Sequence, residues 1–320
     1  MDISVHPYTH QEQQRWDQFV EKARNSTFLL KRPYMDYHAD RFHDTSLVFE
    51  RGNKIVAVLP ANYDHSSKTV WTHQGLTYGG LILSEKCNIK EAMECFDLLM
   101  QHYKALGAEQ LIYKPLPYIY HNYPTEEPLY ALFRHQATLI SRGISSCIDL
   151  KHRLPIAESR KSGTRKAERF DIKVYEGKDE NDIYRFHKVL SQCLMEGHNT
   201  KPVHSPEEMC LLQKRFPDNI RLVLAEETPG AAVAGAWVFD CGNVVHTQYL
   251  AASRDGKKKG ALDKIIASLI DSAAKDHRYF DFGISTEQGG TILNEGLIFQ
   301  KEGFGGRGVC YDAWLVKLQS

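Results

Sequence analysis

The segment Val244–Gly308 decides the fold of this 320-residue chain. In order, it reads VVHTQYLAA (Val244–Ala252), SRDGKKKGA (Ser253–Ala261), LDKIIASLIDSAAKD (Leu262–Asp276), RYFDFGIS (Arg278–Ser285) and FQKEGFGGRG (Phe299–Gly308). This pattern predicts a strand, a cationic loop, an amphipathic helix, a buried strand and a glycine-rich end. A lysine- and glycine-rich loop before a helix combines backbone N–H groups, the positive helix end and side-chain charge. A phosphate-bearing ligand is therefore the first functional hypothesis.

The same order of elements occurs earlier in the chain. The earlier copy begins with SLVFERGNKIVAVLPAN. It continues with THQGLTYGGLIL, which carries a Gln, and then with a helical segment (Asn88–Ala108) and the strand EQLIYKPL. Leu47 and Leu222 are separated by 222 − 47 = 175 positions, and Gln74 and Gln248 by 248 − 74 = 174. An offset of about half the chain indicates a two-copy duplication, not a solenoid of short repeats.

The segment between the copies predicts the domain boundary. We expect a helix over Glu126–His135, a strand over Ile144–Leu150 and a basic segment at Glu158–Phe170. A helix over Asp179–Gly197 then opens the second copy, and a loop and helix over His198–Phe216 follow. The predicted domains are residues 1–155 and 156–320.

Composition is that of a globular protein with local charge. Apolar residues make up 42% of the chain and charged residues 25%, and the formal net charge is zero. Zero net charge gives no global attraction to nucleic acid or membrane. The seven scattered Cys form no C-x-x-C pair, and we find no signal peptide or apolar run of membrane-spanning length. We therefore expect a cytoplasmic protein without a membrane span.

Three stretches resemble a known family. Thr72–Leu83 (THQGLTYGGLIL) is similar to the first-domain signature of tandem-GNAT proteins, and RYFDFGIS with GLIFQKEGFGG (Gly296–Gly306) to the end of their second domain. The chain thus resembles the bacterial FemABX-type and acetyltransferase 6-type GNAT proteins. The resemblance implies an α+β fold of two tandem GNAT-like domains, each a mixed, mostly antiparallel sheet flanked by helices. FemABX-type proteins transfer amino acids from aminoacyl-tRNA to cell-wall precursors, and other relatives use acyl-CoA.

The resemblance implies a donor site in the second domain. The predicted donor-binding residues are Leu250, Ala251, Ala252, Arg254, Gly256, Lys257, Lys258, Lys259, Gly260 and Ala261. The alternative is a solvated charged loop, since charge runs usually face water. The basic segment at 160–169 has the same two readings: a phosphate contact or a solvated helix.

Four residues are predicted to act in catalysis: His246, Tyr249, Tyr279 and Asp281. His246 would be a general base, since an unperturbed imidazole titrates near neutral pH. The tyrosines would protonate a leaving group, and Asp281 would face the active site. Each also has a structural alternative, namely a hydrogen-bonded strand residue or a carboxylate that caps neighbouring backbone.

The acceptor is predicted to bind in a cleft between the domains. The residues assigned to it are His73, Gln74, Thr77, Tyr78, Ser285 and Lys301. A strand bulge at the domain interface is the alternative for the first four. GFGGRG (Gly303–Gly308) matches a dinucleotide fingerprint, but a strand follows it where a helix is required, so we expect a turn between strands.

The sequence thus predicts an N-acyltransferase that moves an acyl group from acyl-CoA to a small-molecule or peptide amine. Acyl-CoA, with acetyl-CoA among the candidates, would be a co-substrate, with no tightly bound cofactor and no metal. Aminoacyl transfer from tRNA is disfavoured by the zero net charge and the absence of a heptad arm. A non-catalytic ligand-binding module is the third alternative. The pattern does not predict the oligomeric state.

Overall fold

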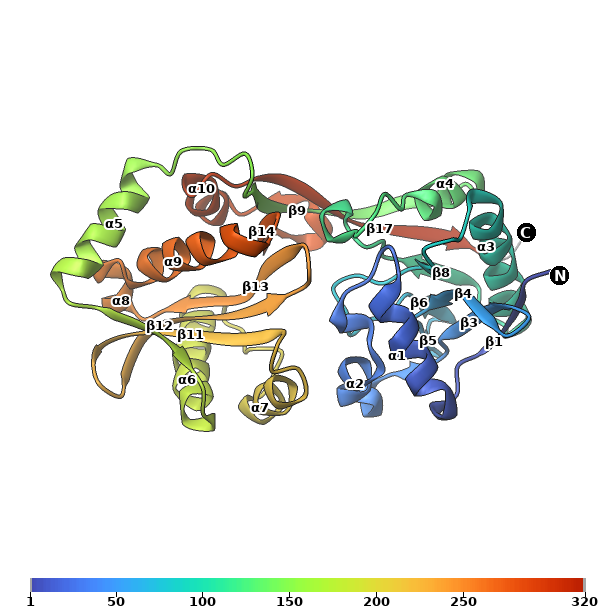
Figure 1. Cartoon of the computed structure of the whole chain (residues 1–320), viewed down its shortest axis with the longest axis horizontal. Coiled ribbons are helices and arrows are strands. Elements are labelled where there is room, and N and C mark those ends of the chain that lie inside the picture. The colour runs from blue at the N-terminus through green and yellow to red at the C-terminus, as the bar shows by residue number, and fades with distance from the viewer. Residues whose placement is uncertain (1, 319–320) are drawn as a thin grey trace. The chain divides into compact units, whose positions relative to one another are not determined.

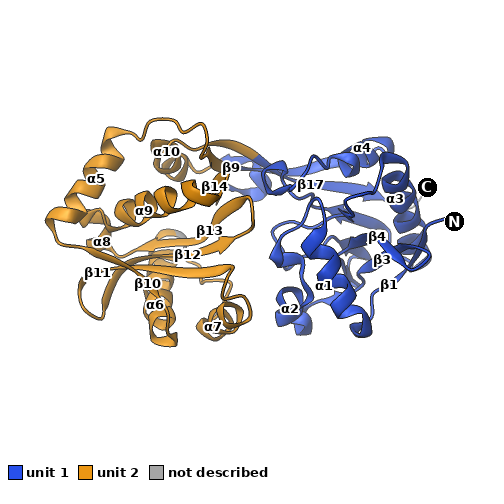
Figure 2. Cartoon of the chain, viewed as in Figure 1, with its two compact units in different colours: residues 1–144, 286–292, 310–320 blue, residues 145–285, 293–309 orange. Residues whose placement is uncertain are grey.

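The computed structural model describes residues 2–318 and divides into two compact units (Figure 2). Unit 1 comprises residues 1–144, 286–292 and 310–320, and unit 2 comprises residues 145–285 and 293–309. The first break falls before the predicted boundary at 155/156. Two long strands, β9 (Thr138–Asp149) and β17 (Arg307–Lys317), contribute residues to both units. The chain therefore enters each unit more than once.

Unit 1 contains two groups of paired strands. One has the order β1-β3-β4-β7, and the other joins the C-terminal part of β17 to β8-β6-β5-β2. Its strands are β1 (Ser4–Pro7), β2 (His43–Asp44), β3 (Leu47–Arg51), β4 (Lys54–Leu59), β5 (Asn62–Asp64), β6 (Thr69–Trp71), β7 (Ile82–Leu83) and β8 (Gln110–Tyr113). Its helices are α1 (Gln13–Lys22), α2 (Arg32–Met35), α3 (Ile89–Ala105) and α4 (Glu127–Arg134).

Helix α3 is positioned by its cap and its apolar face. The Asn88 side chain accepts from the Lys90 and Glu91 backbone N–H groups, and Glu91 accepts from the Asn88 N–H, which forms a capping box. The buried face carries Cys95, Phe96 and Leu99 into one core with residues of β3 and β4. This spacing of three and four residues is the one that the sequence predicted.

Unit 2 is a single layer of strands between helices. Its strands are β10 (Lys173–Gly177), β11 (Ile220–Thr228), β12 (Ala231–Asp240), β13 (Val244–Ala252) and β14 (Tyr279–Ile284), in the order β10-β11-β12-β13-β14-β9. Its helices are α5 (Glu158–Arg169), α6 (Glu180–His198), α7 (Pro206–Arg215), α8 (Arg254–Lys259), α9 (Ala261–Asp276) and α10 (Glu295–Gly303). The short strands β15 (Thr286–Glu287) and β16 (Ile292–Leu293) lie between β14 and α10 in the sequence.

Helices α6 and α9 pack on opposite faces of the unit 2 sheet (Figure 1). Val223 and Ala225 of β11 belong to the core formed with α9. Leu224, between them in the strand, lies with Phe186 of α6 around Gly235. Alternate residues of a strand point to opposite faces, so a nearly continuous apolar strand is required where helices cover both.

Each unit repeats one connection, which agrees with the predicted duplication. In unit 1, β6 and β8 are parallel neighbours, Thr69–Trp71 pairing with Gln110–Ile112. In unit 2, β13 and β14 are parallel neighbours, and α9 connects them. Parallel strands need a crossover, usually a helix, and α3 and α9 fill that role.

Two local predictions are wrong. Residues 254–259, expected as a loop, form helix α8, because Ser253 caps its start and Gly260 ends it in a left-handed conformation. The glycine-rich end is not a turn between two strands. Helix α10 precedes it, and Gly305, with φ of 95°, reverses the chain into β17.

Among the described residues, no helix combines the length and apolarity that crossing a membrane requires.

Arg32 is a buried cation of unit 1, with 1% of its surface exposed. Its Nη2 lies 2.6 Å from an Asp36 oxygen and 2.7 Å from an Asp44 oxygen. Its guanidinium carbon lies 4.0 Å from the Tyr8 ring centroid. This single side chain links α2, β2 and the segment after β1.

We expect the Arg32→Met variant to lose about 3 kcal/mol of unfolding free energy, because two partly buried carboxylates lose a buried cationic partner. Urea denaturation measures the change. Lys68→Met is the control, since the Lys68–Glu109 pair is exposed and such pairs contribute little. Equal effects of the two substitutions would contradict this view of Arg32.

Candidate functional site

The site in unit 2 begins where the pairing of β13 with β14 stops. Only Val244, Val245 and His246 pair with β14, opposite Tyr279, Phe280 and Asp281. Beyond His246, β13 continues to Ala252 paired with β12 alone. A β-bulge lies next to this point. Trp237 of β12 pairs with Tyr249 and Val238 pairs with Thr247, so Gln248 is the extra residue. From Thr247 onward, the edge of β13 that faced β14 is no longer paired with that strand and is open to other contacts.

Asp281 lies at this point and has no exposed surface. One carboxylate oxygen accepts from the Ser145 hydroxyl of β9, and the other lies 3.0 Å from Nδ1 of His246 on β13. An ionised carboxylate is costly to bury unless its oxygens accept hydrogen bonds. The arrangement places the imidazole proton on Nδ1, so that Nε2 is the basic nitrogen of the neutral ring.

Lys301 of α10 holds the end of β14. Its ammonium lies 2.8 Å from the Gly283 carbonyl, 3.1 Å from the Ile284 carbonyl and 2.6 Å from Oγ of Ser285. Gly283 has φ of 76°, and a Cβ built on it would lie 3.2 Å from Cε1 of His246. Burial lowers the pKa of Lys301 to about 8, and Asp281 acts in the opposite direction. The structure thus brings Ser285 and Lys301 together, as two of the six predicted acceptor residues.

The two tyrosines have other contacts than the one between His246 and Asp281. The Tyr249 hydroxyl lies 2.8 Å from Nδ1 of His204, and its ring stacks on Trp237. Tyr279 is at the start of β14, where the Arg278 guanidinium lies 5.0 Å from its ring centroid. Of the four predicted catalytic residues, the structure therefore joins His246 and Asp281 directly.

The predicted donor residues divide between β13 and α8. Leu250, Ala251 and Ala252 pair with β12, and the two alanines are buried. In α8, the N–H of Gly256 donates to the Ser253 hydroxyl and that of Lys257 to the Ser253 carbonyl. The helix therefore uses backbone N–H groups that an open phosphate-binding loop would present to a ligand.

The charged side chains of α8 are not equivalent. Arg254 pairs with Glu196, and Lys259 pairs with Asp255 and Glu227. Lys257 and Lys258 are exposed, and neither makes an ion pair within residues 2–318. Only these two lysines of the predicted cluster carry charge that is not already matched by a carboxylate.

Helix α5 covers the junction of α8 and α9. Gly260 has φ of 74°, and a Cβ built on it would lie 2.1 Å from the Gly163 carbonyl oxygen of α5. Arg160 of α5 bonds to Asp263 in the first turn of α9 at 3.0 Å. A side chain at either glycine would separate the helices, so this close approach explains the glycine at 260, and Ala261 behind it is buried.

The other four predicted acceptor residues lie in unit 1, between β6 and β7. His73 is buried with a φ of 73°, and burial lowers its pKa to about 3. Gln74 is fixed by Asn62 through bonds of 2.7 Å to its backbone and to its side chain. Thr77 is exposed, and the Tyr78 hydroxyl lies 3.3 Å from that of Thr27. Their assignment to an acceptor stays a prediction.

Ser145 is the site residue that the sequence did not reveal. It lies 136 positions from Asp281, in a strand that was expected, but a serine in an apolar strand has no motif to mark it. Within the part of the chain that the structure describes, no group of three His, Cys, Asp or Glu side chains has the geometry to hold a metal ion.

Three solved structures are similar to this chain over nearly its whole length. FemX has a TM-score of 0.69 at 11% identity, covering 98% of this chain and 97% of that one. L-PGS from Bacillus licheniformis has a TM-score of 0.63 at 11% identity, covering 98% and 94%. A tandem GNAT protein from the clavulanic acid biosynthesis pathway has a TM-score of 0.54 at 10% identity, covering 100% and 99%.

These similarities show a tandem-GNAT, FemABX-like fold, and they confirm the predicted α+β class. At these identities they establish the fold alone. No family model matches the chain. No curated protein matches it significantly either.

The depressed pKa of Lys301 predicts a pH-dependent stability. Below about pH 8, both folded and unfolded states keep Lys301 charged, and burial costs a constant amount. Between about pH 8 and 10.5, the unfolded chain binds a proton that the folded chain has lost, so this group makes stability rise with pH.

We expect the difference in unfolding free energy, wild type minus Lys301→Met, to increase across that window by on the order of 3 kcal/mol. Urea denaturation at several pH values measures it. Phe299→Ala, an exposed change in α10 that leaves the ammonium and its three partners in place, is the control, and its difference should be constant. A Lys301→Met difference that is also constant would show that Lys301 does not titrate there.

Proposed function

We propose that this chain is an N-acyltransferase that moves an acyl group from acyl-CoA to a primary amine, with the donor site in its second domain, residues 156–320. The observation that carries the proposal is the buried Asp281–His246 pair at the point where β13 and β14 cease to pair. A carboxylate–imidazole pair beside an unpaired strand edge combines a base with backbone donors for a carbonyl oxygen.

In this proposal, His246 removes the proton that the amine must lose. The amine nitrogen attacks the thioester carbonyl carbon, the carbon–sulfur bond breaks, and an amide and a free thiol result. Nε2 of His246 accepts the amine proton, and a proton returns to the thiolate from the imidazolium. Asp281 holds the Nδ1 proton and stabilises the imidazolium, while Ser145 orients the carboxylate.

Positioning and polarisation of the carbonyl are assigned to β13. Its segment from Thr247 to Ala252 pairs with β12 on one edge, and the pairing with β14 has already ended. Backbone N–H groups on that second edge would donate to the acyl oxygen as negative charge develops there. Pre-oriented donors of this kind are usually the largest contribution to catalysis of acyl transfer.

The phosphate groups of the donor are assigned to the exposed side chains of Lys257 and Lys258. The helical form of α8 limits what its backbone can offer, so charge from these two lysines becomes the main contact. Lys259, held by Asp255 and Glu227, serves the fold instead.

A second candidate function is transfer from aminoacyl-tRNA. The observation in its favour is an exposed basic surface formed by α5 and α8, two helices that pack together. Its exposed cations are Lys161, Arg165, Lys166, Arg169, Lys257 and Lys258. A local surface of this size suits a polyanion even in a chain of zero net charge.

The base is tested by His246→Gln. We expect thiol release from acetyl-CoA, measured with a panel of primary amines, to fall by about 10²–10⁴-fold, because that is the usual contribution of a general base. Binding of acetyl-CoA should be unchanged. Tyr249→Phe is the matched control, since its hydroxyl contacts His204 instead of the pair. Full activity of His246→Gln would overturn the assignment of the base.

The donor is tested by thermal shift with acetyl-CoA, longer acyl-CoAs and aminoacyl-tRNA. A ligand that binds only the folded state raises the melting temperature. We expect stabilisation by an acyl-CoA that is lost in Lys257→Ala/Lys258→Ala and kept in Lys259→Ala. Stabilisation by aminoacyl-tRNA alone, lost when Lys161, Lys166 and Arg169 become alanine, would favour the second candidate. No shift with any donor would support a non-catalytic binding module.

A further inference from the structure

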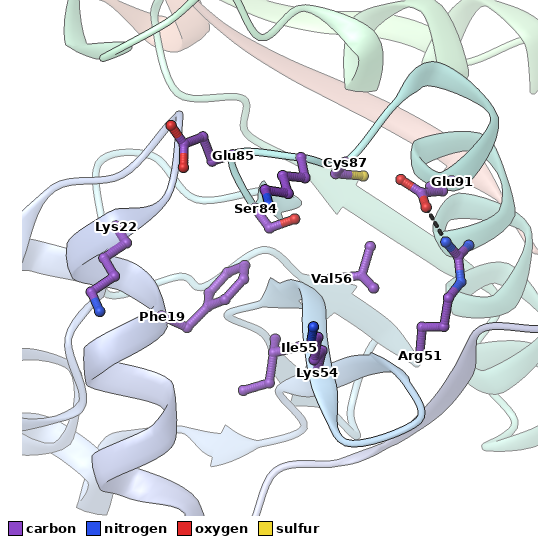
Figure 3. Close-up of a pocket in the computed structure, with 11 residues that line it drawn as sticks. Phe19, Lys22, Arg51, Lys54, Ile55, Val56, Ser84, Glu85, Cys87 and Glu91 are labelled. Carbon is purple, nitrogen blue, oxygen red and sulfur yellow. Dashed lines mark hydrogen bonds and ion pairs between the residues drawn. The ribbon is translucent and has the colours of Figure 1, made fainter. Parts of the chain in front are cut away.

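A cavity of about 360 Å³ lies within unit 1, outside the candidate site. It is bordered by α1, the hairpin of β3 and β4, the turn that follows β7, and the first turn of α3. Figure 3 shows Phe19 on one side, the Arg51–Glu91 pair on the other, and Val56 between them. Its volume falls in the range of about 300–1,000 Å³ that is usual for small-molecule sites.

The cavity exists because the sheet is incomplete there. Strand β7 has two residues and pairs only with Ala57 and Val58, so the first half of β4 has β3 as its strand neighbour on one edge alone. The last contact on the other edge is the Ser84 N–H, 2.9 Å from the Val56 carbonyl. The chain then turns away toward α3 and leaves the cavity beside the β4 edge.

A bulge in β4 makes the floor apolar. Phe49 faces Ala57 and Glu50 faces Ile55, so Val56 is the extra residue. Neighbouring side chains of a regular strand point to opposite faces, but a bulge can turn two of them to one side. Ile55 and Val56 therefore both line the cavity, together with Phe19.

Three lysines, Lys22, Lys54 and Lys86, surround this apolar floor. All three are exposed, and within residues 2–318 none of them makes an ion pair. One carboxylate, that of Glu85, lines the cavity next to Lys86 in the sequence. It is exposed and points away from Val56 (Figure 3). The rim thus carries three lysines against the single carboxylate of Glu85, which is an excess of positive charge.

The fourth cation, Arg51, belongs to the wall. Its Nη1 is paired with Glu91, whose other oxygen caps α3. Its Nε is buried and has no hydrogen-bond acceptor among the described residues. Beside it, burial raises the pKa of Cys87 to about 12, so the thiol is uncharged and adds to the apolar lining.

We propose that this cavity binds a small amphipathic anion, with a single apolar chain against Phe19, Ile55 and Val56 and a carboxylate or phosphate head group at the lysine rim. The apolar floor supplies affinity by removing the chain from water. The unpaired lysines supply the preference for an anion over a cation. The site lies wholly in unit 1 and does not depend on the transfer reaction proposed for the second domain.

Isothermal titration of the full chain with octanoate and with octyl phosphate tests the proposal and distinguishes the two head groups. We expect at least one of them to bind. Octylammonium, with the same chain and opposite charge, and acetate or inorganic phosphate, without the chain, should not bind measurably. Octylammonium binding as tightly as both anions, or binding by neither anion, would overturn the proposal.

Two variants locate the site. Lys22→Glu/Lys54→Glu should weaken binding about tenfold or more at low salt, because the rim changes sign. Ile55→Trp should abolish binding by filling the cavity. Lys275→Glu, an exposed change in α9 of unit 2, is the control for charge. Circular dichroism confirms that each variant is folded. Unchanged binding in a folded Ile55→Trp variant would place the ligand elsewhere and reject this site.

Discussion

The buried carboxylate of Asp281 is the constraint on which the second unit depends. It has no exposed surface, and the hydrogen bonds of Ser145 and His246 to its two oxygens offset the cost of burying its charge. These partners come from β9 and β13, the two strands that flank β14. One side chain therefore fixes the register of three strands, one of which, β9, has its other half in unit 1. The same contacts set the tautomer of the imidazole, so stability and proposed chemistry share one set of hydrogen bonds.

Both proposed ligand sites arise where regular strand pairing ends. In unit 2, β13 and β14 pair over three residues and then separate, next to a bulge at Gln248. In unit 1, β7 ends after two residues, next to a bulge at Val56. A strand edge without a partner must find other contacts for its backbone and side chains. In the second unit, the hydrogen-bonded Ser145, Asp281 and His246 and the ammonium of Lys301 lie at this point. In the first unit, an apolar cavity with a cationic rim lies there.

Helix α8 shows how a sequence pattern can carry two meanings. Glycine and lysine at residues 256–260 suggested an open loop, since both are frequent in phosphate-binding turns. Ser253 as an N-cap, lysines as good helix formers and Gly260 as a left-handed C-cap are equally the signs of a short helix. Packing decides between them, because α5 contacts Gly260 through Gly163, a residue almost a hundred positions away. In the function proposed above, this helix leaves Lys257 and Lys258, instead of the backbone, as the main contact for an anion.

The sequence by itself determined the duplication, the order of elements in each copy, the presence of α3 and α9 and the tandem-GNAT character of the fold. These follow from local periodicity and from repetition at a fixed offset, which need no knowledge of distant contacts. It also selected His246 and Asp281. Only the tertiary structure decided that these two touch, that the Tyr249 hydroxyl contacts His204, that Ser145 completes the network and that two lysines of three are unpaired. Those facts depend on strand register and on burial, which join residues far apart in the chain and leave no local pattern to read.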